Sequence, residues 1–360
     1  MSFSRREMMT MSGAAAAVLS SHGVMAQGFR KPCRKRMGVS IASYGYHRRQ
    51  ALTDHPEGVP FHSAIDFLEH CRKLGAGGVQ TGITGWKNRA YGKRVREWLE
   101  AYDMYFEGQI RLPRDKSEIP EFERDIIAAK EAGVSVVRTV MLGGRRYETF
   151  KSLTEWEDFR RRSWQSLTLV EPIMARHKTT LAVENHKDWT LEEMVGLMKR
   201  ISSEWVGVTL DTGNNISLLD DPEEVVDGLA PYAVTSHFKD MGVQQYKDGF
   251  LLSEVPLGSG FLDLKKMVRR LEKEGRNIQY NLEMITRDPL KVPVLTPQYW
   301  ITLGDLRGEK LASMLKTVAE HSPVKPLPRV SHLGLSESVE VEQRQVEMSF
   351  AYWRQALGIS

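Results

Sequence analysis

Three carboxylates and one imidazole each stand at the end of a short apolar run in this chain. They belong to Glu184, Asp211, His237 and Glu283. Carboxylate oxygens and imidazole nitrogens are ligands of hard to borderline divalent metal ions. If the apolar runs are parallel strands of one barrel, their carboxyl ends lie at one rim and the four side chains meet there. The residue types therefore predict a divalent metal site, and with it an enzyme.

The spacing of these residues matches a repeating strand and helix unit. Glu184 and Asp211 are 27 residues apart, and Asp211 and His237 are 26 apart. One strand, one helix and their two loops take about this length. His237 and Glu283 are 46 residues apart. We interpret the polar, glycine-containing segment 242–260 as a loop insertion, and what remains is again one unit.

Eight apolar runs along the chain are predicted strands. Several are nearly continuous in Val, Ile and Leu, which is typical of parallel strands buried on both faces. Between them, apolar residues such as Phe67, Leu68 and Cys71 recur at helical spacing and indicate amphipathic helices. This alternation predicts an α/β fold of the (β/α)8 TIM-barrel type. The predicted strands are residues 36–43, 78–82, 104–111, 135–142, 179–184, 206–211, 233–237 and 278–283.

A doubly wound sheet is the alternative α/β architecture. It requires a glycine-rich nucleotide loop after an early strand. The glycines at positions 75, 77 and 78 instead precede the second predicted strand. They indicate the end of a helix, and we therefore favour the barrel.

The two ends of the chain differ from the barrel. Arg5 and Arg6 precede a short apolar stretch and Ala26, which predicts a twin-arginine signal peptide over residues 1–27. A disordered tail with a chance arginine pair is the alternative. The signal predicts export to the periplasm or the exterior, and no later apolar run reaches the roughly 18 residues that span a membrane. We assign the barrel to residues 36–321, and a Pro-rich linker and C-terminal helical extension to 322–360.

Composition supports one large domain without a polyanionic partner. The chain has 360 residues, of which 41% are hydrophobic, and a formal charge of +4. This content is enough for a sizeable core, whereas the charge is too small to indicate nucleic-acid binding. Cys33 and Cys71 are the two cysteines. We assign them no chemistry and leave their pairing open.

Four motifs carry a resemblance to a known family. The segments VENH, LDTGN, SHFKD and NLEMITRDP contain the four predicted ligands. Together they resemble the xylose-isomerase-like TIM-barrel superfamily of sugar phosphate isomerases and epimerases, over most of residues 36–320. The resemblance implies that Glu184, Asp211, His237 and Glu283 bind one Mn²⁺ or Mg²⁺, with Co²⁺ or Zn²⁺ as alternatives. It also implies that Glu184 and Glu283 transfer protons, and that the substrate is a small carbohydrate.

The chemistry of such a site favours proton abstraction. A divalent ion that polarises a sugar carbonyl makes the adjacent C–H acidic and stabilises an enediolate. Two carboxylates on opposite faces then remove and return the proton, which is isomerisation or epimerisation. A leaving group on the neighbouring carbon turns the same intermediate into a lyase reaction, so a lyase acting on 3-keto-sugars or keto-glycosides is the alternative. A non-catalytic sugar-binding barrel is a third, and the oligomeric state stays open.

Five further residues are predicted to bind substrate. They are His186, Lys239, Trp86, Asn214 and Arg287. His186 and Lys239 each lie two positions past a ligand and share its face in an extended strand. The alternatives are a surface histidine at 186 and an ion pair between Lys239 and Asp240.

The other three have separate rationales. Trp86 follows the second predicted strand, where its ring can stack on the C–H face of a sugar. Asn214 stands where some similar epimerases place a substrate-contacting histidine. Arg287 can reach an anionic or hydroxyl-rich ligand, with a structural ion pair as the alternative.

Overall fold

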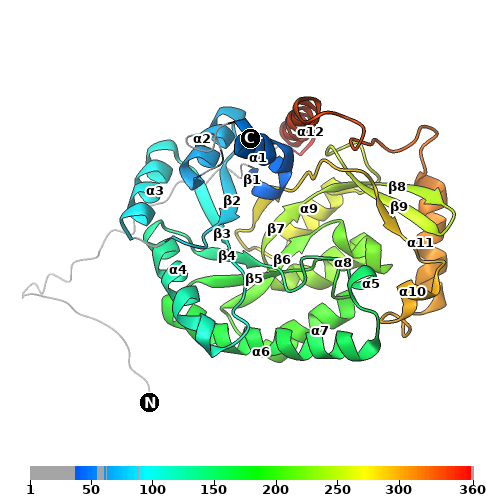
Figure 1. The fold of residues 1–360 in the computed structure, drawn as a ribbon, viewed down its shortest axis with the longest axis horizontal. Coiled ribbons are helices and arrows are strands. Elements are labelled where there is room, and N and C mark those ends of the chain that lie inside the picture. The colour runs from blue at the N-terminus through cyan, green and yellow to red at the C-terminus, as the bar shows by residue number, and fades with distance from the viewer. Residues whose placement is uncertain (1–36, 55–60, 62, 87–88, 358–360) are drawn as a thin grey trace, which may run out of the picture. The chain divides into compact units, whose positions relative to one another are not determined.

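Eight parallel strands close into a barrel (Figure 1). The computed structural model describes residues 37–54, 61, 63–86 and 89–357. The barrel order is β1-β10-β7-β6-β5-β4-β3-β2, and β1 pairs with β10 to complete the ring. The predicted TIM-barrel fold is therefore confirmed. The strands are β1 (Gly38–Ser40), β2 (Gly78–Gly82), β3 (Tyr105–Gln109), β4 (Val136–Thr139), β5 (Thr180–Glu184), β6 (Val206–Asp211), β7 (Ala233–Phe238) and β10 (Gln279–Leu282).

Amphipathic helices lie between the barrel strands. Their starts follow local capping chemistry: Thr190 and Glu193 form a capping box, and Asp221 caps a helix that has Pro222 in its first turn. Gly75 ends the first long helix in the left-handed region, at φ 81°, as its position before β2 predicts. These helices are α2 (Ala64–Leu74), α3 (Arg89–Tyr102), α4 (Ile119–Glu131), α6 (Leu153–His177), α7 (Leu191–Ile201), α8 (Pro222–Leu229) and α9 (Leu264–Glu272).

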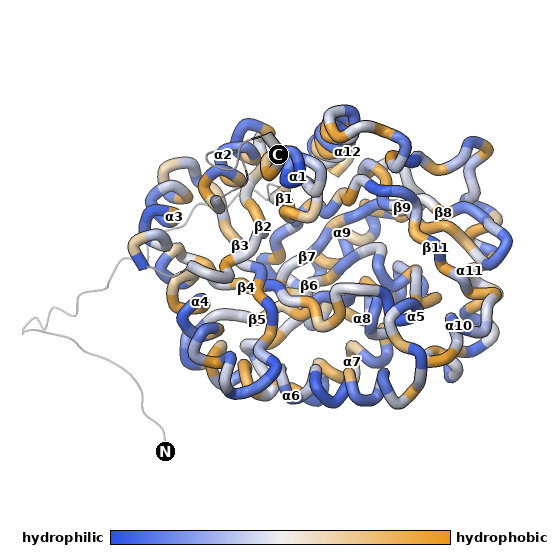
Figure 2. The backbone as a smooth tube through the Cα atoms, viewed as in Figure 1, coloured by the Kyte–Doolittle hydropathy of each residue, from blue (hydrophilic) through white to orange (hydrophobic). Residues whose placement is uncertain are grey.

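The core lies between the barrel strands and these helices. Figure 2 shows hydrophobic and hydrophilic residues alternating along α6 and α7, as expected for helices with one buried face. Buried Val, Leu and Ile side chains of the strands join the apolar faces of the helices in one continuous cluster. Cys71 is part of that cluster as a free thiol, whereas Cys33 and the predicted signal peptide lie outside the described residues. Among the described residues, no helix combines the length and apolar character needed to cross a membrane.

The segment after β7 is a second sheet, and its interpretation as a loop insertion is wrong. Strands β8 (Asp240–Tyr246) and β9 (Gly249–Val255) form an antiparallel hairpin, and β11 (Leu290–Val292) pairs with β9. All seven residues of β9 are buried, including Glu254. Helix α11 (Gly308–His321) packs against this hairpin. The run Phe250 to Leu252 forms a strand because both of its faces are covered.

Helix α12 (Leu335–Ala356), the predicted C-terminal helical extension, packs on the outside of the barrel. Trp353 contacts the rings of Phe238 on β7 and Tyr280 on β10. The carboxylate of Glu342 accepts hydrogen bonds from the backbone N–H groups of Tyr46 and His47, which begin helix α1 (Gly45–Asp54). A carboxylate at a helix N-terminus complements the helix dipole. The last helix thus covers the strands where the barrel closes and anchors the first helix.

Asp288 ties the chain that precedes α12 to the barrel. Its carboxylate accepts hydrogen bonds from the backbone N–H groups of Val330, at 2.8 Å, and Ser331, at 3.0 Å. The Ser331 hydroxyl and the Arg329 guanidinium donate to the same carboxylate. Burial acts to raise the pKa of Asp288, but these donors lower it to about 2.

This contact predicts a pH dependence of stability. The carboxylate is ionised above its unfolded pKa near 3.8 and is protonated only as pH falls through the folded value of about 2. Asp288→Asn should therefore lower the free energy of unfolding at pH 5, and the difference from wild type should shrink between pH 4 and pH 2. Urea unfolding across this range measures it. A constant difference at every pH would show that the charge of Asp288 is not involved.

Candidate metal centre

The four predicted ligands meet at the carboxyl rim of the barrel. Glu184 and Asp211 are the last residues of β5 and β6, His237 lies near the end of β7, and Glu283 directly follows β10. Asp211 and His237 are register partners on neighbouring strands. One ligand atom from each residue lies within 4.8 Å of the others, and all four residues are buried. The barrel register therefore assembles the set that the sequence predicts.

His237 is oriented from below by a buried polar network. Its Nε2 lies 2.6 Å from Gln80 Oε1, and Gln80 Nε2 donates to Glu107 at 3.0 Å. The bond to Glu107 fixes which end of the Gln80 amide faces His237, so His237 Nε2 is the donor. In the neutral imidazole, Nδ1 then presents a lone pair to the carboxylates. A histidine metal ligand is commonly held in this way through its other nitrogen.

Two buried atoms at the centre fit a divalent ion. His237 Nδ1 and Asp211 Oδ2 make no hydrogen bond of good geometry with any described residue. Lys239 Nζ lies 2.9 Å from Asp211 Oδ2 as an ion pair, and His237 Nδ1 lies 3.2 Å from Glu283 Oε1. Buried polar atoms without a bonding partner are costly, and a divalent ion held by three carboxylates and one imidazole would satisfy them.

Glu184 is held on both oxygens. The Arg138 guanidinium donates twice to Glu184 Oε2, with Nε at 2.6 Å, and Asn214 Nδ2 donates to Oε1 at 3.0 Å. Burial acts to raise the pKa of Glu184, but Arg138 and His237 lower it below its ordinary value. The carboxylate is therefore ionised at neutral pH in a fixed position.

Lys239 lies among the predicted ligands. Its Nζ is 2.6 Å from Glu283 Oε2 and 3.1 Å from Asn214 Oδ1. Burial acts to lower the pKa of Lys239, but Asp211 and Glu283 raise it. The alternative ion pair with Asp240 is wrong, because the carboxylate of Asp240 accepts backbone N–H groups of the segment after β9.

Burial and charge also act on Glu283, Asp211 and His237. Burial acts to raise the pKa of Glu283, but His237 and Lys239 lower it well below its ordinary value. Burial raises the pKa of Asp211. Burial acts to lower the pKa of His237, whereas Glu283 and Glu184 raise it to about 9. Because a ligating imidazole is neutral, metal binding at neutral pH would displace a proton from His237.

Two of the predicted substrate-binding residues, His186 and Arg287, have different surroundings in the structure. His186 is half-buried, and its Nδ1 is inaccessible and makes no hydrogen bond with a described residue, so the ring is not fully exposed on the surface. Burial and the charge of Lys187 lower the pKa of His186 to about 3, which leaves it neutral at neutral pH. Arg287 forms the structural ion pair that was its alternative, with both Nε and Nη2 donating to Glu254 of β9.

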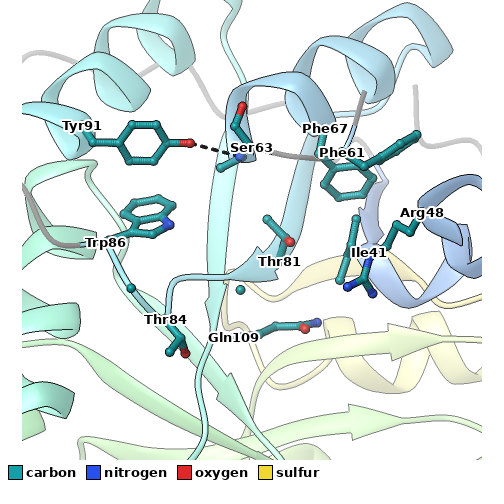
Figure 3. Close-up of a pocket in the computed structure, with 13 residues that line it drawn as sticks. Ile41, Arg48, Phe61, Ser63, Phe67, Thr81, Thr84, Trp86, Tyr91 and Gln109 are labelled. Carbon is teal, nitrogen blue, oxygen red and sulfur yellow. Dashed lines mark hydrogen bonds between the residues drawn. The ribbon is translucent and has the colours of Figure 1, made fainter. Parts of the chain in front are cut away.

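Trp86 lines a cavity of about 630 Å³ beside the cluster (Figure 3). Figure 3 shows Trp86 and Tyr91 on one side, Phe61 and Phe67 on the other, and Gln109 between them. Gln109 Nε2 donates to Gln80 Oε1 at 2.9 Å, the atom that also contacts His237. The cavity lies at the carboxyl ends of β1 to β3 and thus at the same rim as the ligands.

Several residues of the cluster were not predicted. They are Gln80, Glu107, Arg138, Lys187 and Glu254. Each of the first three directly follows a buried apolar residue of its strand, namely Val79, Phe106 or Val137. A buried polar residue requires a partner, so such a position is itself a signal. Lys187 directly follows His186, which was predicted. Glu254 was not predicted because its strand was interpreted as part of a loop insertion.

The sequence of most of the barrel matches a known protein family. Residues 68–303 match the Xylose isomerase-like TIM barrel family, which is more than half of the chain. The chain therefore belongs to this family. It is also 28% identical over 119 residues to 3-oxo-isoapionate decarboxylase of Pectobacterium atrosepticum. That alignment covers 32% of this chain and 43% of the decarboxylase, so the match spans less than half of its length.

Solved structures share the fold at low sequence identity. A D-psicose 3-epimerase, determined in the presence of D-fructose, has a TM-score of 0.55 and 13% identity, over 90% of this chain and 99% of that one. A Xylose isomerase-like TIM barrel protein from Mycobacterium smegmatis, in complex with magnesium, has a TM-score of 0.52 and 16% identity. It covers 78% of this chain and 97% of its own. At these identities the likeness shows the fold.

The orientation of His237 by Gln80 predicts a change in metal affinity. Gln80→Leu removes the acceptor for His237 Nε2 and should weaken binding of one Mn²⁺ or Mg²⁺ by about 10- to 100-fold. Competition with a fluorescent chelator measures the dissociation constant. Gln165→Leu, on the exposed side of α6, is the matched control and should bind as wild type does. Equal affinity in both variants would refute the role of Gln80.

Proposed function

We propose that this protein is a divalent-metal-dependent sugar isomerase or epimerase that acts by proton abstraction next to a carbonyl. The observation that carries this proposal is the pair of buried, ionised glutamates, Glu184 and Glu283, within one predicted ligand set. A divalent ion bound there would polarise the substrate carbonyl and lower the pKa of the neighbouring C–H. The fold shared with a D-psicose 3-epimerase supports the sugar class.

The two glutamates have different restraints. Both oxygens of Glu184 accept hydrogen bonds, from Arg138 and Asn214. Glu283 contacts Lys239 and His237 and has no guanidinium partner among the described residues. Arg138 opposes protonation of Glu184, and His237 and Lys239 oppose protonation of Glu283, so charge alone does not rank the two. We assign the first base to Glu283 because no guanidinium of a described residue holds it in place, and Glu184 to the opposite face of the reacting carbon. Because both glutamates start ionised, Glu184 must take up a proton from solvent before it gives one to the opposite face, and Glu283 must release the abstracted proton before the next turnover.

The surrounding side chains stabilise the charge that develops. Removal of a proton beside a carbonyl leaves an enediolate with negative charge on oxygen. The Lys239 ammonium lies 2.6 Å from Glu283 Oε2 and is held among Asp211, Asn214 and Glu283. Its position is therefore fixed before the reaction, so stabilising the enediolate requires no reorganisation. Burial of the cluster excludes water and strengthens this interaction.

A lyase is the second candidate function. The sequence similarity to 3-oxo-isoapionate decarboxylase favours it, since loss of a group beside a carbonyl gives the same kind of enediolate. The same cluster would then act on 3-keto-sugars or keto-glycosides, with one glutamate returning the proton. Export by the twin-arginine route remains part of the proposal, because residues 1–27 lie outside the described part of the chain.

Proton exchange in D₂O tests the proposed function. Metal-loaded protein is incubated with free ketoses and 3-keto-glycosides, and each substrate is followed by proton NMR. Deuterium beside the carbonyl with a new stereoisomer is expected for an isomerase or epimerase. New vinylic signals, or loss of carbon dioxide, would instead establish the lyase.

The variant Glu283→Gln tests whether Glu283 is the base that removes the proton. The variant should lose about 10²- to 10⁴-fold in exchange rate, as expected when a general base is removed. Because Glu283 is also a predicted ligand and the ion-pair partner of Lys239, the exchange rate is measured at saturating metal and below the melting temperature of the variant. Glu97→Gln, exposed on α3, is the matched control. Exchange that persists in Glu283→Gln, or that survives removal of the metal by a chelator, would refute the mechanism.

A further inference from the structure

Lys187 is a buried ammonium without an acidic partner. Its side chain lies in the loop after β5, and the residue is 2% exposed. Lys187 Nζ donates to Asn214 Oδ1, a neutral amide oxygen. Among the described residues, no carboxylate oxygen lies within 4.0 Å of Lys187 Nζ. A buried charge normally has a partner of opposite sign, so this residue requires an explanation.

The other cations of the cluster are paired. Arg138 contacts Glu184, Lys239 contacts Asp211 and Glu283, and Arg287 contacts Glu254. Each of these contacts is an ion pair within 4.0 Å. Lys187 is therefore the exception at this rim. The lysine ammonium has three N–H donors, and the hydrogen bond to Asn214 uses one of them.

Lys187 is close to the predicted reaction centre. Asn214 Oδ1, which accepts from Lys187, also accepts from Lys239 Nζ at 3.1 Å. Asn214 Nδ2 donates to Glu184 Oε1 at 3.0 Å. One amide group thus separates the Lys187 ammonium from a predicted metal ligand. His186, the preceding residue, also has a buried nitrogen, Nδ1, without a partner.

The charge of the cluster favours an anionic ligand. Four cations, Arg138, Lys187, Lys239 and Arg287, face four carboxylates, Glu184, Asp211, Glu254 and Glu283. These charges balance, and a divalent ion with a neutral His237 adds two positive charges. The buried carboxyls of Glu107 and Asp188 also lie at this site, but burial raises the pKa of Asp188 to about 7, so that it is only partly ionised at neutral pH and the two offset these charges only in part. An anionic group on the substrate would compensate the remainder beside Lys187.

We propose that the substrate is a keto-sugar acid whose carboxylate binds Lys187. This inference rests on the proposed function and names its substrate class. A single ammonium with two donors that no described residue accepts suits a carboxylate. A phosphate, with its larger charge, usually requires several donors. The nearby guanidinium of Arg146 is not available for that purpose, because it bonds to Glu193 and Thr302.

Three ketoses that differ at one carbon test the proposal. D-fructose, D-fructuronate and D-fructose 6-phosphate carry a hydroxyl, a carboxylate and a phosphate at C6. Isothermal titration calorimetry of the Mg²⁺-loaded protein should show D-fructuronate binding about ten-fold or more tightly than D-fructose, as one charge-assisted hydrogen bond allows. Lys187→Met should remove the preference, and Lys265→Met, an exposed lysine on α9, should keep it.

The outcomes separate this inference from the proposed function. Equal binding of D-fructose and D-fructuronate, or tightest binding of D-fructose 6-phosphate, would overturn the carboxylate site while leaving proton exchange in D₂O intact. Loss of exchange with an intact carboxylate preference would overturn the reaction but not the site.

If none of the three ketoses binds, the melting temperature of Lys187→Met tests the proposal. A functional ammonium that is buried without an acidic partner destabilises the fold, and Asn214 Oδ1 keeps Lys239 as a donor when Lys187 is replaced. Lys187→Met should therefore raise the melting temperature by about 2 °C or more. A lower melting temperature in Lys187→Met would show that Lys187 supports the structure, and would overturn the proposal.

Discussion

Burial of charge at the carboxyl rim is the constraint on which the rest of this molecule depends. Glu184, Asp211 and Glu283 are almost inaccessible to solvent, and ionised carboxylates in such a place are strongly unfavourable unless they are paired. Arg138 and Lys239 provide that pairing. Their positions require strands whose register is fixed on both sides. A closed barrel meets this requirement because every strand has two hydrogen-bonded neighbours.

The fold and the ligand set could be predicted because both produce patterns within short stretches of sequence. Apolar strand runs, capping residues such as Thr190, and the regular spacing of Glu184, Asp211 and His237 are all visible within short windows. In a parallel barrel, residues at equivalent strand ends meet whatever the intervening helices contain. The barrel fold therefore predicts that the four ligands lie close together in space, although they are far apart along the chain.

The supporting residues could not be predicted in the same way, because their partners are distant in sequence. Gln80 and His237 are 157 residues apart, and Arg138 and Glu184 are 46 apart. Glu254 was missed because the apolar run in β9 was too short to distinguish a buried strand from an irregular insertion. The hairpin is covered by α11, and this tertiary contact decides its structure. A polar residue that directly follows a buried apolar residue of a strand, such as Glu107 after Phe106, indicates that such a distant partner exists.

The closure of the barrel also determines the order in which contacts form during synthesis and folding. Ser43, just beyond β1, hydrogen-bonds to Leu282 of β10, 239 residues away, and Glu342 of α12 bonds to Tyr46, 296 residues away. Contacts this distant form late, because a large loop must close before they are gained. A growing chain on the ribosome holds Glu184, Asp211 and His237 long before Glu283 and the closing helix exist. The complete ligand set therefore assembles only once β10 has been synthesised and has paired with β1, and a shorter growing chain that ends before β10 holds three of the four ligands.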